Sequence, residues 1–220
     1  MKRIIIHWTA GHYAASELDL LHYHFVIDGM GKVHPGKFPV VANEAPQKGR
    51  YAAHTLNCNT GSIGVAVAAM AGAQERPFNR GSAPILQAQL AALAALCADL
   101  GRDYGIPITR QTMLTHAEVQ LTLGIQQRGK WDISWLPGMT AVGDPVIVGD
   151  KIRAMIKAGP PMPVDDTPMF NPTPGAHGAS VVKPPVSSKP VVDTKSPVKA
   201  RQNWLAIIAA IFRAIFGAKK

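Results

Sequence analysis

Residues 3–7 read Arg-Ile-Ile-Ile-His, a run of β-branched side chains that ends in a polar ring. A strand that is apolar at successive positions is typical of the centre of a sheet whose two faces are both covered. Only three isoleucines separate Lys2-Arg3 from His7, so the run is too short for the apolar region of a secretory signal peptide. We therefore predict a central strand here and no signal peptide.

The rest of the first 158 residues alternates between strand and helix patterns. Strands are predicted over residues 23–27, 32–34, 62–68 and 111–114, and helices over residues 82–101 and 150–157. Asp28-Gly29 marks a hairpin between the first two of these strands, and Ser82 is expected to cap the first helix. Strands mixed with helices, with a hairpin among them, predict an α/β fold with a central mixed β-sheet flanked by helices.

The composition is that of a folded chain. Of the 220 residues, 47% are hydrophobic and 17% are charged, which excludes a wholly disordered protein. No apolar stretch reaches the about 18 to 20 residues of a membrane-spanning helix. Two cysteines, Cys58 and Cys97, cannot form a disulfide framework, so packing, with or without a metal ion, must stabilise the fold.

The composition changes near Gly159. Residues 159–200 hold 10 of the 18 prolines of the chain, which excludes a continuous helix or a packed sheet in this segment. We therefore predict three parts. They are a folded domain over residues 1–158, a disordered Pro-rich linker over residues 159–202 and a cationic C-terminal helix over residues 203–220.

The predicted C-terminal helix is amphipathic. Asn203 can cap it, and its large apolar side chains from Trp204 to Phe216 fall on one half of the helical wheel, opposite Arg213. Residues 159–220 carry 8 basic and 3 acidic side chains. This pattern predicts binding to anionic membrane lipid, and docking on the folded domain is the alternative. No nucleic-acid partner is expected, because the segment lacks a cluster of Lys and Arg.

Two histidines follow predicted strands, since His7 closes the isoleucine run and His116 comes after residues 111–114. Strand ends hold metal ligands well because the sheet fixes them while the loop leaves one side open. Asp132 is a candidate third ligand, and Lys130, two residues earlier in an extended segment, faces the same side. Two neutral imidazoles and a carboxylate leave a fourth position for water, as in hydrolytic zinc sites. Structural histidines and a surface salt bridge are the alternatives.

These residues belong to an ordered set of motifs. The set comprises His7-Trp8-Thr9-Ala10-Gly11, Tyr23-His24-Phe25 before Asp28-Gly29, His54 before Ser62-Ile63-Gly64-Val65, Thr115-His116, and Lys130 with Asp132. It resembles the zinc N-acetylmuramoyl-L-alanine amidases, a superfamily that includes phage lysozymes of the amidase type and the peptidoglycan recognition proteins. The resemblance covers about residues 1–150.

The resemblance implies a role for each residue of the candidate site. His7, His116 and Asp132 would bind Zn²⁺, Tyr23 and Lys130 would lie beside the scissile amide, and Thr9 and His54 would lie near the bound substrate. The implied reaction is hydrolysis of the amide between N-acetylmuramic acid and L-alanine in peptidoglycan. Because no signal peptide is predicted, we expect a monomeric phage or prophage endolysin, made in the host cytoplasm and released to the cell wall at lysis.

Other interpretations stay open at this point. A cytosolic amidase that recycles soluble anhydromuropeptides would carry the same motifs, as would a module that binds muropeptides without cleaving them. Either Tyr23 or Glu118 can be the proton acceptor, and Glu118 is the reserve ligand if Asp132 fails. Two departures from the family pattern bear on these roles, since the interval from His7 to Tyr23 is short and the loop before Lys130 is long.

Overall fold

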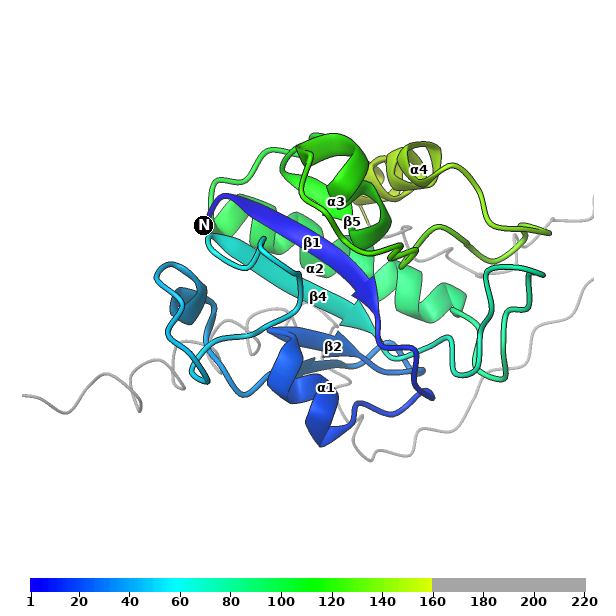
Figure 1. The fold of residues 1–220 in the computed structure, drawn as a ribbon, viewed down its shortest axis with the longest axis horizontal. Coiled ribbons are helices and arrows are strands. Elements are labelled where there is room, and N and C mark those ends of the chain that lie inside the picture. The colour runs from blue at the N-terminus through cyan, green and yellow to red at the C-terminus, as the bar shows by residue number, and fades with distance from the viewer. Residues whose placement is uncertain (160–220) are drawn as a thin grey trace, which may run out of the picture. The chain divides into compact units, whose positions relative to one another are not determined.

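The computed structural model describes residues 1–159, so the predicted linker beyond Gly159 and the C-terminal helix lie outside the described residues (Figure 1). The division into domains therefore stays a prediction. The strands are β1 (Arg3–Trp8), β2 (Phe25–Ile27), β3 (Val33–Pro35), β4 (Ser62–Val67) and β5 (Met113–Thr115). The helices are α1 (Glu17–His22), the 3-10 helix η1 (Val40–Asn43), α2 (Gln87–Asp103), α3 (His116–Leu123) and α4 (Pro145–Ala158).

The five strands form one sheet in the order β3-β2-β4-β1-β5. β1 lies between β4 and β5 and is parallel to both, while β2 is parallel to β4 and antiparallel to β3. The hairpin predicted around Asp28-Gly29 is the β2–β3 pair. The predicted mixed central sheet flanked by helices is thus confirmed, and the three isoleucines of β1 are fully buried, as expected of a central strand.

The two faces of the sheet are covered unequally, because side chains alternate between faces along a strand. Ile4 and Ile6 belong to a large apolar core that includes the buried residues of α2 and α4, and Figure 1 shows α2 behind β1 and β4. Ile5 belongs to a much smaller cluster that includes Val119 of α3. His7 follows Ile5 by two residues, so it points to this more thinly covered face.

Helix α2 begins later than predicted, because Ser82 does not cap it. The helix starts after Leu86, whose N–H donates to Gln89 Oε1 at 3.1 Å. Ser82 instead directs both its N–H, at 2.9 Å, and its hydroxyl, at 3.4 Å, to the Ala71 carbonyl, closing the loop that precedes the helix. The sequence contained a good capping residue, but the loop uses that residue for another hydrogen bond.

Two other helix boundaries differ from the predicted ones. α2 runs to Asp103, beyond the predicted end at Gly101, since the glycine that adopts a left-handed φ of 63° is Gly105. α4 begins at Pro145, well before the predicted start, because Asp144 caps it by accepting hydrogen bonds of 2.9 and 3.0 Å from the first turn. An aspartate before a proline is a helix-start signal that the apolar spacing alone does not reveal.

The short helices α1 and α3 are additions to the predicted elements. α1 starts with a reciprocal pair of hydrogen bonds between Ser16 and Asp19. At the start of α3 the Thr115 N–H donates to Glu118 Oε2 at 2.8 Å. Both helices are too short for an apolar repeat to stand out in the sequence. No helix within residues 1–159 is both long enough and apolar enough to cross a membrane.

A buried ion pair joins α3 to α4. Arg153 Nη2 lies 2.7 Å from Glu118 Oε1, and Arg153 Nη1 lies 3.1 Å from Glu118 Oε2, with both residues almost fully buried. A Cβ added to Gly149 of α4 would overlap the Glu118 carboxylate, so glycine at this position lets the two helices approach. The position of α3, which begins with His116, therefore depends on this pair.

We expect Arg153→Met to destabilise the fold by about 3–5 kcal/mol, because it leaves the Glu118 carboxylate buried without its partner. Urea unfolding followed by circular dichroism measures this loss. Arg102→Met is the matched control, since Arg102 forms an equally short pair of 2.6 Å with Asp99 on the exposed face of α2 and should lose almost nothing. Equal losses in the two variants would show that burial of the Glu118 pair does not matter.

Candidate metal centre

Parallel pairing brings His7 and His116 to the same edge of the sheet. Ile6 of β1 is opposite Thr115 of β5, and the two histidines are the next residues along these adjacent strands. His116 follows β5 directly as the first residue of α3, whereas His7 lies inside β1 and not at its end. Asp132 comes from the loop between α3 and α4. Three segments far apart in the sequence therefore meet at one place.

The three side chains present one atom each to a common point. His7 Nδ1 lies 3.0 Å from His116 Nδ1. Asp132 Oδ2 lies 3.1 Å from His116 Nδ1 and 3.4 Å from His7 Nδ1. All three residues are buried, and their atoms lie within 4.8 Å of one another, close enough to bind a single metal ion.

The hydrogen bonds behind His116 fix its tautomer. Gln127 Nε2 donates to the Leu56 carbonyl at 2.9 Å, which leaves Gln127 Oε1 as the acceptor that faces the imidazole. This oxygen lies 2.9 Å from His116 Nε2, so Nε2 carries the proton. His116 Nδ1 therefore presents a lone pair to the common point.

A second series of contacts, through His54 and Thr55, orients the His7 ring and indicates which of its nitrogens carries the proton. His54 Nε2 lies 3.4 Å from the Ser62 carbonyl and is assigned the proton, so His54 Nδ1 is an acceptor. His7 Nε2 faces two acceptors, His54 Nδ1 at 3.3 Å and Thr55 Oγ1 at 3.4 Å, and donates to them. With that proton on Nε2, His7 Nδ1 would face His116 and Asp132 with a lone pair.

This arrangement of donor atoms fits a metal ion. Two imidazole nitrogens and a carboxylate oxygen meet at one point, and such a set of donor atoms suits a cation. Two nitrogens and one oxygen with an open fourth side match the ligand set of hydrolytic zinc sites. The orienting contacts of Gln127 and His54 are those expected behind metal-binding histidines.

Burial and the neighbouring groups shift the pKa values of His7 and Asp132. Burial lowers the pKa of His7 to about 4, helped by the nearby His116 and Lys130 and opposed by Asp132. Burial alone would raise the pKa of Asp132, but its contacts with His116 and His7 hold that pKa well below its usual range. At neutral pH the site therefore holds a neutral His7 and an ionised Asp132.

A cavity of about 470 Å³ opens over these residues. Its lining includes Tyr23, His54, His116, Lys130 and Asp132, so side chains predicted to act together do lie together. Lys130 and Asp132 share this cavity, as their spacing predicts. Burial, with the nearby carboxylates of Asp132 and Asp19, raises the pKa of Tyr23, so its hydroxyl keeps its proton and can donate.

Comparison with known proteins identifies the family of the chain. The family profile described as N-acetylmuramoyl-L-alanine amidase matches residues 1–137. The chain belongs to this amidase family. No curated protein matches the chain.

Solved structures give low-identity matches to this family member. The amidase LysC from Clostridium intestinale is 18% identical with a TM-score of 0.42, over 71% of this chain and 85% of LysC. The Ph2119 endolysin from a Thermus scotoductus bacteriophage is 16% identical with a TM-score of 0.40, over 68% and 82%. AmiD from E. coli, in complex with anhydro-N-acetylmuramic acid-L-Ala-D-gamma-Glu-L-Lys, is 21% identical with a TM-score of 0.38, over 54% and 49%. The family assignment rests on the profile match.

Thr9 and Glu118 do not join the cavity of this amidase. Thr9 is absent from the lining, and its Oγ1 accepts a hydrogen bond of 3.1 Å from the Gly11 N–H. Its predicted contact with substrate stays a prediction. Both oxygens of Glu118 are bound to Arg153, and one also accepts from Thr115 N–H. The expectation that Glu118 serves as proton acceptor or reserve ligand is therefore corrected.

Gln127 and Thr55 are supporting residues that the sequence did not reveal. Each is a common polar residue in a loop, and only the tertiary contacts with His116 and His7 give it a role.

Gly64 belongs to one of the sequence motifs, and the structure shows why this position is a glycine. A Cβ at Gly64 would lie 2.5 Å from His54 Cγ, so the bare backbone of β4 makes room for the His54 ring.

We expect Gly64→Ala to destabilise the protein by about 1–3 kcal/mol, because the added methyl group overpacks the space that His54 fills. In a His54→Ala background the ring is gone, and the same substitution should cost less than half as much. Urea unfolding of the four proteins gives the coupling between the two positions. Additive losses would mean that the His54 ring does not pack on Gly64.

Proposed function

We propose that the chain is a zinc-dependent N-acetylmuramoyl-L-alanine amidase whose ligands are His7, His116 and Asp132. The observation that carries this proposal is the convergence of three metal-binding atoms beside an open cavity. Membership of the amidase family supplies the bond that is cleaved, the amide between N-acetylmuramic acid and L-alanine. Zinc, when bound, would activate water for attack and polarise the carbonyl of that amide.

The residues of the chain have separate tasks in this reaction. Lys130 and Tyr23 line the same cavity as two of the ligands and can donate hydrogen bonds to the carbonyl oxygen as its negative charge develops. His54 holds His7 in place, and we propose that it also lies near the substrate, together with Thr9. Asp132 carries the only carboxylate among the described residues that line the cavity. The imidazoles of His7 and His116 both contact this carboxylate.

The proposed substrate is the polymeric cell wall, with the protein acting as a phage or prophage endolysin. The support comes from the sequence, since a Pro-rich segment and a cationic amphipathic segment follow the amidase domain. A recycling amidase would act on soluble anhydromuropeptides and would have no evident use for such a tail. The expected monomeric state and the expected lack of a nucleic-acid partner remain predictions.

The ligand proposal is tested with a pair of variants that separate metal binding from catalysis. Asp132→Asn should lose zinc and activity together, because it removes the one anionic ligand. Tyr23→Phe should keep its zinc while its rate falls by about 10²- to 10³-fold, the usual cost of removing one oxyanion donor. Zinc is measured by elemental analysis, and activity as release of peptides from purified sacculi without new reducing sugars.

Asp28→Asn is the matched control for Asp132→Asn. Asp28 also contacts one imidazole, His34 Nε2 at 2.7 Å, but it lies in the β2–β3 hairpin away from the cavity. Zinc content and activity should be unchanged in this control. Undiminished zinc in Asp132→Asn would reject Asp132 as a ligand. Cleavage of soluble anhydromuropeptides but not of sacculi by the wild type would favour the recycling enzyme.

We further propose that residues 203–220, which lie outside the described residues, bind anionic lipid. The full chain should sediment with vesicles of phosphatidylglycerol and not with phosphatidylcholine, and added salt should weaken this binding. A chain that ends at residue 202 should not sediment with either vesicle. Equal sedimentation of both chains would remove the lipid role from this segment.

A further inference from the structure

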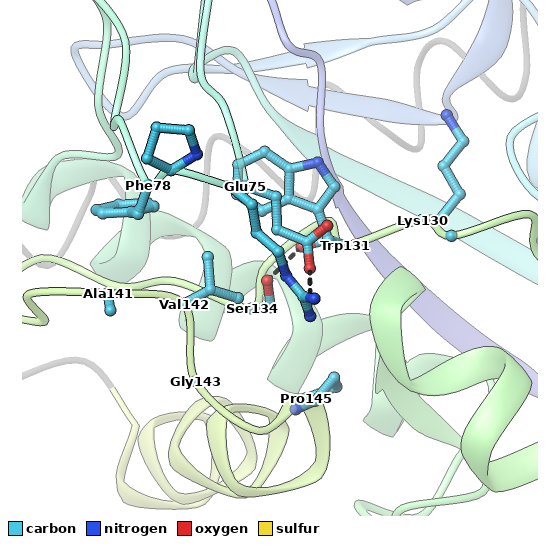
Figure 2. A pocket seen from close by; sticks show the side chains of 12 residues that line it. Glu75, Phe78, Lys130, Trp131, Ser134, Ala141, Val142, Gly143 and Pro145 are labelled. Atoms are coloured by element: carbon cyan, nitrogen blue, oxygen red, sulfur yellow. Dashed lines mark hydrogen bonds and ion pairs between the residues drawn. The ribbon is translucent and has the colours of Figure 1, made fainter.

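A second and larger cavity adjoins the candidate metal centre. It has a volume of about 790 Å³, and Lys130 lines both it and the 470 Å³ cavity. Figure 2 shows the Lys130 side chain extending away from the other side chains of this larger cavity. A ligand that fills both cavities would therefore pass Lys130, where the proposed function places the scissile amide.

One wall of the larger cavity is a loop that is held by its own hydrogen bonds. Gln74 and Asn79 exchange backbone hydrogen bonds of 2.8 and 2.9 Å, and Met70 donates to the Ala83 carbonyl. These bonds present residues 75–78 at the tip of a paired loop. The wall is thus formed before any ligand arrives, which reduces the entropy that binding costs.

Aromatic rings line the cavity, and each is supported from behind. Trp131 packs edge-on against Trp8 of β1, with ring centroids 4.6 Å apart. Phe78 packs against the buried Trp135 at 5.7 Å. Both lining rings are partly exposed. They offer apolar surface at fixed positions next to a hydrolytic centre.

Around these rings the charges of Glu75 and Arg76 balance each other, and Lys130 at the border with the smaller cavity adds one positive charge. Glu75 and Arg76 form an ion pair of 3.9 Å, and Ser134 donates to the Trp131 carbonyl at 2.6 Å (Figure 2). An anionic peptide would meet the Glu75 carboxylate as well as the Arg76 guanidinium. A sugar ring fits better, because its C–H face packs on the negative face of an aromatic ring while its hydroxyl and amide groups reach the polar rim.

We propose that this larger cavity is a binding site for the glycan strand, occupied by sugar units next to the muramic acid that carries the scissile amide. The inference rests on the proposed amidase function and deepens it. The smaller cavity would then hold the peptide side of the amide. The chain is therefore built for polymeric peptidoglycan with several sugars and not for a fragment with a single sugar.

The test compares two soluble substrates with Phe78→Ala. On a peptide-bearing fragment of four sugars, kcat/KM should fall by roughly fivefold to tenfold, in line with the loss of one aromatic contact. On the single-sugar N-acetylmuramoyl peptide it should be unchanged. Tyr104→Ala is the matched control, since Tyr104 is a partly exposed aromatic residue at the end of α2 that lines neither cavity.

Two other outcomes of this comparison contradict the glycan site. Equal losses on both substrates would mean that Phe78 supports the metal centre or the fold, and no loss on either would mean that the cavity binds no sugar. Titration of the wild type with tetra-N-acetylchitotetraose, followed by tryptophan fluorescence, gives a readout that does not need catalysis. Binding that Phe78→Ala weakens, in a protein that cleaves neither substrate, would refute the amidase proposal but keep the sugar site.

Discussion

The parallel pairing of β1 with β5 is the constraint on which the candidate site depends. The register places Ile6 opposite Thr115, so the next residues, His7 and His116, must be neighbours. Backbone hydrogen bonds within a buried sheet hold the facing nitrogens of these imidazoles 3.0 Å apart. The sheet thus supplies the rigidity with which the two imidazoles and the carboxylate would hold the proposed metal ion.

The layers behind the sheet then fix the orientation of each ring. On the site face, β4 carries Gly64 opposite Ile5 and Ala66 opposite His7, small residues that leave room for the imidazole of His54. On the other face its branched side chains join the main core. The same strand therefore packs tightly on one side and accommodates polar rings on the other, because alternate residues serve different faces.

The loop around Lys130 links the metal centre to the wider surface. Asp132 turns inward to the two histidines, Trp131 packs against Trp8, and Lys130 borders both cavities. A short stretch of chain thus contributes to the candidate ligand set, the cavity over it and the aromatic wall beside it.

Much of the fold and the grouping of the candidate residues could be predicted from local sequence. Apolar runs and turn residues predicted the central strand and the hairpin. Their places after predicted strands pointed to His7 and His116, and the resemblance to the amidases grouped them with Asp132; the roles of these residues remain proposals. The sequence alone did not determine that Ser82 bonds to a loop instead of capping α2, or that the Glu118 carboxylate faces Arg153. Those outcomes depend on contacts between residues distant in the chain. A polar side chain can form hydrogen bonds with several kinds of group, and only the tertiary structure decides which of them lies within reach.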